Sequence, residues 1–234
     1  MRRVLITIDI DNFQRENSRQ SMLHASAKWG VEFLPFNRKH YGDYYGTTFN
    51  KAILDLIAYG YDEMMFIDAD CIIRSDAPNP FEMIKEDKIV AVQNGNERIG
   101  NYPNTLNQHL YNLLRINQQR GMLEIIEKPD IYFNTGFMLS KVSTMRRLCH
   151  LVRAIMPDLN YDRFNSIYEQ ALFNYASRCI SPNLDNPFVS FVDESWNYMY
   201  PSNLEYQTDW VYHISNDVPN RNHILDNIKW RVDQ

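Results

Sequence analysis

The sequence predicts an α/β fold in which helices flank a mostly parallel sheet, and three observations support this prediction. Strand and helix patterns alternate through the first third of the chain at the spacing of βαβ units. Short apolar runs, such as 4–8 and 63–67, are typical of buried strands. Glycines follow two helical segments, at Gly30 and Gly60, where helices commonly end. A chain of 234 residues with 44% hydrophobic content can bury one substantial core, so we expect a single domain, 1–234.

The elements of the first third are defined by their apolar patterns and by the residues that end them. Gly30 and Gly60 each stop a helical pattern, and the last apolar run leads directly into Asp68. In chain order the predicted elements are a strand at 4–9, a helix at 17–29, a strand at 31–36, a helix at 48–59 and a strand at 63–67.

The rest of the chain is less regular. Prolines predict a turn at 76–80, and the polar segment 93–104 is a loop able to close over a ligand. The predicted elements are a strand at 89–92, a helix at 105–120, a strand at 132–139, a helix at 142–155 and a helix that begins near Ser166. After Ser181, prolines and aromatic residues dominate, and only the residues around His213 suggest a strand.

Composition excludes several classes of function. The formal net charge of -5 gives no basic stripe, which argues against nucleic-acid binding. Three widely spaced cysteines without a C-x-x-C pair argue against a disulfide framework and a structural zinc site, and they fit a reducing cytoplasm. Asp9 and Asp11 interrupt the N-terminal apolar run too early for a signal peptide, and no stretch is long enough for a membrane span. The oligomeric state is left open.

A pair of aspartates, Asp68 and Asp70, follows the strand at 63–67. In open α/β sheets ligands bind beyond the carboxyl ends of the strands, which is where this pair lies. Two carboxylates separated by one residue can share a divalent cation through oxygen ligands, and that cation can neutralise a diphosphate. The triplet alone is a weak signal, because Asp9-Ile10-Asp11 is a second instance in the same chain.

Four segments together resemble one known family. They are the stretch 48–73 with its Asp-Ala-Asp triplet, YFNTGFML at 132–139, EQALFN at 169–174 and YHIS at 212–215. In this order they resemble the glycogenin and galactosyltransferase-like glycosyltransferases, the family 8 type with the GT-A fold. The resemblance implies a nucleotide-sugar-binding half at 1–100 and an acceptor-side half at 101–234. It also implies transfer from a nucleotide-diphosphate sugar, with UDP favoured, to a hydroxyl of a carbohydrate or glycoconjugate.

The resemblance assigns roles to particular residues. The cofactor it implies is Mn²⁺ or Mg²⁺, held by Asp68, Asp70 and His213. The donor-binding residues it implies, alongside the two aspartates, are Thr7, Ile8, Asp9, Lys51, Ala69, Asn134 and Gly136. The catalytic candidates are Glu169, Gln170 and Asp70. The family's C-terminal lysine for the diphosphate has no clear counterpart here, and Arg221 and Lys229 are candidates by position alone.

The expected mechanism uses the metal as a Lewis acid for the departing nucleoside diphosphate, with Lys51 as a second positive group. Two stereochemical courses stay open. In an inverting reaction Glu169 is the candidate base for the acceptor proton. In a retaining reaction, as in the resembled family, a donor phosphate oxygen takes that proton and Glu169 and Gln170 position the sugar or the acceptor.

Each assignment has a structural alternative. Thr7 and Asp9 suit a cap of the turn after the first strand, and Asn134 and Gly136 suit a β-bulge. His213 suits a hydrogen-bonded strand residue. The aromatic residues considered as a sugar platform also suit a core; they are Trp196, Tyr198 and Trp210.

Three other functions are compatible with parts of the sequence. A haloacid-dehalogenase-like phosphatase would use Asp9 as nucleophile and Asp11 as acid, but Asn12 and Phe13 stand where that family has Gly-Thr. A metal-dependent nuclease is disfavoured by the acidic charge. A non-catalytic module for nucleotide-sugars or glycans would retain the fold without activity.

Overall fold

The computed structural model describes residues 1–9, 14–37, 48–94, 132–155, 168–180, 188–199, 209–214 and 220–232. Its centre is a six-stranded sheet in the order β2-β1-β3-β6-β5-β7. The strands are β1 (Arg3–Ile8), β2 (Glu32–Phe36), β3 (Glu63–Ile67), β5 (Ile89–Asn94), β6 (Tyr132–Lys141) and β7 (Val189–Val192). β6 runs antiparallel to its neighbours β3 and β5, whereas the other three pairings are parallel. The predicted α/β fold with a mostly parallel sheet is confirmed.

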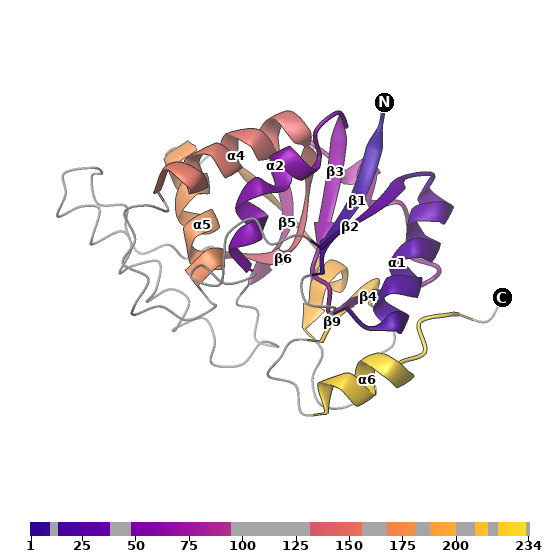
Figure 1. The fold of residues 1–234 in the computed structure, drawn as a ribbon. Coiled ribbons are helices and arrows are strands. Elements are labelled where there is room, and N and C mark those ends of the chain that lie inside the picture. The colour runs from indigo at the N-terminus through magenta and orange to yellow at the C-terminus, as the bar shows by residue number, and fades with distance from the viewer. Residues whose placement is uncertain are drawn as a thin grey trace.

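Helices cover both faces of this sheet (Figure 1). On one face lie α2 (Leu54–Ile57), α4 (Val142–Ile155) and α5 (Tyr168–Ile180), and on the other lies α1 (Glu16–Trp29). Successive side chains of a strand point to opposite faces, so each apolar strand serves two cores. In β3, Met64 and Phe66 pack with the α4 and α5 side, while Met65 and Ile67 pack with the α1 side.

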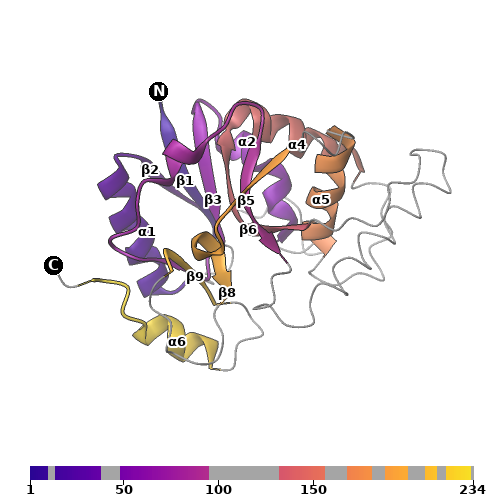
Figure 2. The same cartoon turned by 180° about the vertical axis from the view of Figure 1, so that it is seen from behind.

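A second, three-stranded sheet lies at the end of the first, beyond the carboxyl end of β3 (Figure 2). It has the order β4-β9-β8, formed by β4 (Cys71–Ile73), β9 (Val211–His213) and β8 (Tyr198–Met199). Ile72 and Tyr212, on one face of this sheet, pack against α6 (Arg221–Asn227) and Trp230, while Cys71, Ile73 and Val211 belong to the core on the α1 side. The Asn17 amide of α1 donates to the carbonyl oxygens of Leu225 and Asp226 at 3.0 and 2.8 Å, which fixes the end of α6 against α1.

Most element predictions are confirmed within the described residues, with differences that have local causes. The predicted helix at 48–59 is instead a 3₁₀ helix, Thr48–Ile53, followed by the single turn of α2. Asn50 and Lys51 are buried there, and an apolar period does not encode buried polar residues. β4, β7 and α6 were not predicted, because each is too short to produce a recognisable pattern.

Several sequence predictions fall on other parts of the chain. The helix at 105–120, most of the loop at 93–104 and the helix start at Ser166 lie outside the described residues. The division into a donor half and an acceptor half stays a prediction. Among the described residues, no helix combines the length and the apolar character that crossing a membrane requires.

Candidate functional site

The Asp68–Asp70 turn is held between the two sheets by its main chain. All five residues of β3 are buried, and the strand delivers Asp68 to the sheet edge. The Asp68 N–H donates to the Gly136 carbonyl oxygen of β6 at 3.0 Å. On the other side, the Ile214 N–H donates to the Asp70 carbonyl oxygen at 3.1 Å. The turn therefore has a fixed position relative to both β6 and β9.

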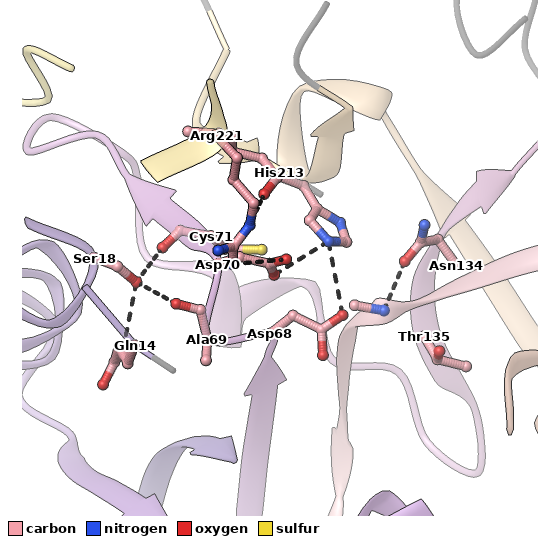
Figure 3. A network of polar contacts seen from close by, with 12 residues as sticks. Gln14, Ser18, Asp68, Ala69, Asp70, Cys71, Asn134, Thr135, His213 and Arg221 are labelled. Atoms are coloured by element: carbon pink, nitrogen blue, oxygen red, sulfur yellow. Dashed lines mark hydrogen bonds and ion pairs between the residues drawn. The ribbon is translucent and has the colours of Figure 1, made fainter. Parts of the chain in front are cut away.

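His213 joins the two aspartates to form a compact group, called here the Asp–Asp–His cluster (Asp68, Asp70 and His213). His213 Nε2 lies 3.3 Å from Asp70 Oδ1 and 3.8 Å from Asp68 Oδ2 (Figure 3). Burial opposes a charge on the imidazole, but the two carboxylates outweigh it and raise the pKa of His213 above its usual value. Burial likewise opposes ionisation of Asp70, but His213 and then Arg221 lower the pKa of that carboxyl.

Lys51 brings a buried positive charge to the other side of Asp68. Its Nζ lies 2.9 Å from Asp68 Oδ1 and 3.3 Å from Glu169 Oε1. Burial works to lower the pKa of Lys51, but the charges of Asp68 and Glu169 prevail and raise it. Burial also raises the pKa of Glu169, and Lys51 opposes that effect. Lys51 is thus a permanently charged group between two carboxylates, 5% exposed.

Arg221, at the start of α6, supplies a second positive charge. Its Nη2 lies 3.4 Å from Asp70 Oδ2, and its Nε donates to the Ile214 carbonyl oxygen at 2.9 Å. Lys229, the other candidate by position, is exposed on the chain segment after α6. The sequence offered no stronger signal for Arg221, because its place at the site depends on how α6 packs against the small sheet.

β6 presents Asn134, Thr135 and Gly136 to the site through a break in its pairing with β5. Ala91 pairs with Met138, whereas Val92 pairs with Asn134, so the register shifts between them. The predicted β-bulge at Asn134 and Gly136 is therefore present. Asn134 Oδ1 accepts a hydrogen bond from the Gly136 N–H at 2.6 Å, which fixes the amide side chain within the bulge.

At Gly136 the backbone of β6 lies directly against the side chains of the Asp–Asp–His cluster. A Cβ at this position would lie 2.7 Å from Asp68 Oδ2 and 2.8 Å from His213 Cε1. Real Cβ atoms essentially never come so close to other atoms. Glycine at this position therefore leaves the room that the side chains of Asp68 and His213 occupy.

α5 carries two of the three predicted catalytic residues, Glu169 and Gln170, and packs against β6. Gln170 Oε1 accepts a hydrogen bond from the Thr135 N–H at 3.1 Å, so the Gln170 side chain is oriented by the bulge. Asn174, one turn later, accepts from the Phe133 N–H at 2.8 Å and donates to the Phe133 carbonyl oxygen at 2.9 Å. These hydrogen bonds join the EQALFN segment of α5 to the FNTG segment of β6. Thr135 carries no signal of this contact in the sequence, because its part in it depends on the packing of α5 against β6.

The first strand contributes differently. Asp9 Oδ1 accepts a hydrogen bond from the Gln14 N–H at 2.7 Å, which agrees with the capping alternative. Thr7 is fully buried, and Ile8 is partly buried beside it. Ala69 contacts α1 through its carbonyl oxygen, 2.7 Å from the Ser18 hydroxyl. Within the described part of the chain, no contact joins Asp9 to the Asp–Asp–His cluster.

The aromatic residues considered as a sugar platform have structural contacts. Trp196 is 5% exposed and packs against Phe137, with 5.8 Å between ring centroids. Arg74 lies over the Trp210 ring, 4.4 Å from its centroid. The Tyr198 side chain lies outside the described residues. The two tryptophans thus fit the core alternative.

The donor set of the Asp–Asp–His cluster fits a divalent cation. Lys51 and Arg221 each contact one carboxylate oxygen of the aspartates, and His213 Nε2 lies near the other oxygen of each, Asp68 Oδ2 and Asp70 Oδ1. An octahedral ion with ligand distances of about 2.0–2.1 Å has neighbouring ligand atoms roughly 3 Å apart. The separations of His213 Nε2 from Asp70 Oδ1, 3.3 Å, and from Asp68 Oδ2, 3.8 Å, are close to this value, so the imidazole is placed to share an ion with either carboxylate.

Comparisons with known proteins identify the fold. No protein-family model and no curated protein sequence matches the chain. Among solved structures, a glycosyltransferase involved in glycosylation of the major capsid of PBCV-1 matches with a TM-score of 0.60 at 12% identity, over 97% of this chain and 98% of that chain. The galactosyltransferase LgtC, in complex with donor and acceptor sugar analogues, matches with a TM-score of 0.53 at 11% identity, over 95% and 94%.

The bifunctional glycosyltransferase WbbM also matches, with a TM-score of 0.55 at 11% identity. This match covers 93% of the present chain but 46% of WbbM, so the chain spans about half the length of that protein. At such identities the likeness concerns the fold. The chain has the fold of these glycosyltransferases, which agrees with the prediction of a GT-A type fold.

Proposed function

We propose that this chain is a metal-assisted glycosyltransferase that moves a sugar from a nucleotide-diphosphate donor, with UDP favoured, to a hydroxyl of a carbohydrate acceptor. One observation carries the proposal. The Asp–Asp–His cluster lies at the carboxyl end of β3, between the positively charged side chains of Lys51 and Arg221, in a chain with the fold of known glycosyltransferases. Ligands of open α/β sheets bind at this edge.

The charges of the cluster suit a diphosphate. Asp68, Asp70 and His213 would hold Mn²⁺ or Mg²⁺, which supplies Lewis-acid stabilisation of the departing diphosphate when bound. Lys51 and Arg221 place two further positive charges beside the aspartates. Positive groups fixed in advance stabilise the negative charge that develops on a leaving group without reorganising during the reaction.

The surroundings of Glu169 favour a positioning role for this residue over a role as catalytic base. Its carboxylate is 3% exposed and paired with Lys51, so an acceptor hydroxyl has little access to it. Gln170 is likewise oriented by its hydrogen bond with Thr135. This arrangement favours the retaining course, in which a donor phosphate oxygen takes the acceptor proton. We also propose that the chain is a member of the glycogenin-like glycosyltransferase family 8.

The alternative functions gain less support. A phosphatase nucleophile must reach its substrate, whereas the Asp9 carboxylate is engaged with the Gln14 N–H. Asp11, the acid of that alternative, lies outside the described residues. A non-catalytic binding module would retain the same donor contacts, so only turnover separates it from an enzyme.

The test is a thermal-shift titration with UDP-, GDP-, CMP- and dTDP-sugars, with and without Mn²⁺. The proteins are the wild type, the Asp68→Asn/Asp70→Asn double variant and the control Asp87→Asn, whose side chain is 83% exposed. A ligand at about 100 times its Kd adds about 2.7 kcal/mol to stability. We expect Mn²⁺-dependent stabilisation of the wild type and the control by one nucleotide family, and its loss in the double variant. A wild type indifferent to every donor, with or without metal, refutes the proposal.

Turnover is measured next with the stabilising donor. Release of the nucleoside diphosphate, with water or added sugars as acceptor, identifies an enzyme. A tightly bound donor that is never cleaved in the presence of a panel of acceptors would instead indicate the non-catalytic module.

A further inference from the structure

A buried thiol adjoins the Asp–Asp–His cluster. Cys71 begins β4 and pairs directly with His213 of β9 in the antiparallel register. Directly opposed residues of an antiparallel pair have side chains on the same face, with Cβ atoms about 4.5–5.5 Å apart. Figure 3 shows the Cys71 sulfur beside the Asp70 carboxylate. Within the described residues, the ligand atoms of Asp70, Cys71 and His213 all lie within 4.8 Å of one another.

We propose that Asp70, Cys71 and His213 form a zinc site that overlaps the site for the hard cation. The set consists of one carboxylate, one thiolate and one imidazole, all of which are common ligands of Zn²⁺. Zinc sites with three protein ligands keep a fourth, open position. Mg²⁺ and Mn²⁺ favour oxygen ligands, whereas thiolate favours Zn²⁺. On binding, the Cys71 thiol gives its proton to the buffer and its sulfur lone pair to the metal.

The two sites share two ligands and differ in the third. Asp68 completes the site for Mn²⁺ or Mg²⁺, and Cys71 completes the site for Zn²⁺. The two cannot be filled at once, because both ions need the Asp70 carboxylate and the His213 imidazole, whose ligand atoms lie within 4.8 Å of each other. Lys51 strengthens the distinction, since its Nζ lies 2.9 Å from one oxygen of Asp68, the ligand that belongs to the site for the hard cation alone.

The consequence for activity rests on the proposed function. An ion drawn toward Cys71 is displaced from Asp68, which is the side that faces Lys51 and the expected donor diphosphate. Zinc therefore acts as a competitive inhibitor of the Mn²⁺-supported reaction. Zinc binding itself stands apart from the proposed function and can be measured without any donor.

Cobalt(II) provides the direct test, because it replaces zinc and reports its ligands by colour. We expect Co²⁺ bound to the wild type to show a near-ultraviolet thiolate-to-cobalt charge-transfer band, and Zn²⁺ to abolish that band by displacement. The band should persist in Cys179→Ser and Cys149→Ser, which remove the other two thiols, and disappear in Cys71→Ser. Bound Co²⁺ without a thiolate band in the wild type overturns the proposal, as does a band that survives in Cys71→Ser.

Calorimetry supplies the magnitude. Loss of even an outer-shell partner of a metal ligand costs roughly 10- to 100-fold in affinity, so loss of the thiolate should weaken Zn²⁺ binding by at least about tenfold. Mn²⁺ affinity should stay near the wild-type value in Cys71→Ser. Equal loss for both ions, or for neither, overturns the proposal. If Cys71→Ser fails to fold, loss of the wild-type band in His213→Gln decides the same question.

The outcomes separate this inference from the proposed function. A thiolate band without any Mn²⁺-dependent donor binding leaves the zinc site standing and removes the glycosyltransferase. Mn²⁺-dependent donor binding without a thiolate band leaves the glycosyltransferase standing and removes the zinc site.

Discussion

Gly136 offers a sharp test of how β6 shapes the site. In Gly136→Ala the added Cβ would lie 2.7 Å from Asp68 Oδ2, 2.8 Å from His213 Cε1 and 2.9 Å from Asn134 Oδ1. Favourable contacts between such atoms lie at about 3.5–4.0 Å, so the overlap is roughly 1 Å. All three obstructing atoms belong to side chains, which can rotate away while the backbone stays in place.

This geometry predicts a modest loss of stability with a large loss of metal affinity. Overpacking by one methyl group in a tight interior costs about 1–3 kcal/mol of unfolding free energy. Displacing Asp68 and His213 removes two of the three ligands from their shared position. We therefore expect Mn²⁺ affinity to fall by roughly 10- to 100-fold or more.

A matched control separates the two effects. Gly30 ends α1 with φ +67°, and a Cβ there would meet no atom within 4 Å. Gly30→Ala should lose about 1–2 kcal/mol through the left-handed backbone, with Mn²⁺ affinity unchanged. Thermal unfolding gives the stability of each variant, and electron paramagnetic resonance of free Mn²⁺ gives its affinity. If Gly136→Ala binds Mn²⁺ as tightly as Gly30→Ala, the reasoning is wrong.

Three further predictions follow from buried charges. Lys51→Met leaves Glu169 buried without its cation and should lower the free energy of unfolding in urea by about 3–5 kcal/mol, with partial recovery when Glu169→Gln is added; a double variant less stable than Lys51→Met would contradict this. Burial opposes the His213 charge but nearby carboxylates raise its pKa above 6.5, so its contribution to stability is complete below pH 6.5 and is lost as pH rises through the raised value. The melting temperature of EDTA-treated protein should therefore fall as the pH rises above 6.5, and it should fall less in His213→Gln. An equal dependence of melting temperature on pH in both proteins would disprove the assignment. Arg153→Met leaves the carboxylate of Asp55, which is 2% exposed, without its ion-pair partner, and should lower the free energy of unfolding by about 3 kcal/mol, measured by thermal unfolding. Mn²⁺ affinity should stay unchanged, and weakened Mn²⁺ binding would contradict this prediction.

The parts of the site that the sequence predicted are those attached to strong local patterns. Asp68 follows a fully buried strand, so its position at the sheet edge could be inferred from the apolar run alone. The register shift near Gly136 was foreseen as a β-bulge, because glycine within a strand often marks one. The convergence of these segments came from a family resemblance rather than from periodicity.

The parts that the sequence did not predict depend on tertiary contacts. Arg221 reaches Asp70 only because α6 packs against the small sheet and Asn17 fixes its end. Cys71 acquires its place beside His213 through the pairing of β4 with β9. The residues around His213 suggested a strand, but β4 has three residues and is too short to identify from a pattern, and nothing in the sequence indicated that the two strands pair. Lys51 lies buried in a 3₁₀ helix where the sequence predicted an α-helix, and no local propensity indicates such burial.

The main-chain hydrogen bonds on either side of Asp68 and Asp70 have a mechanical consequence. One bond attaches the turn to the large sheet and the other attaches it to the small sheet, so the two carboxylates lie on the joint between them. Any sliding of one sheet past the other would change the distance between these carboxylates directly. A constant distance between the carboxylates therefore requires that the two sheets keep their relative position, so a contact that loosens the small sheet would disturb the site even if it touched neither aspartate.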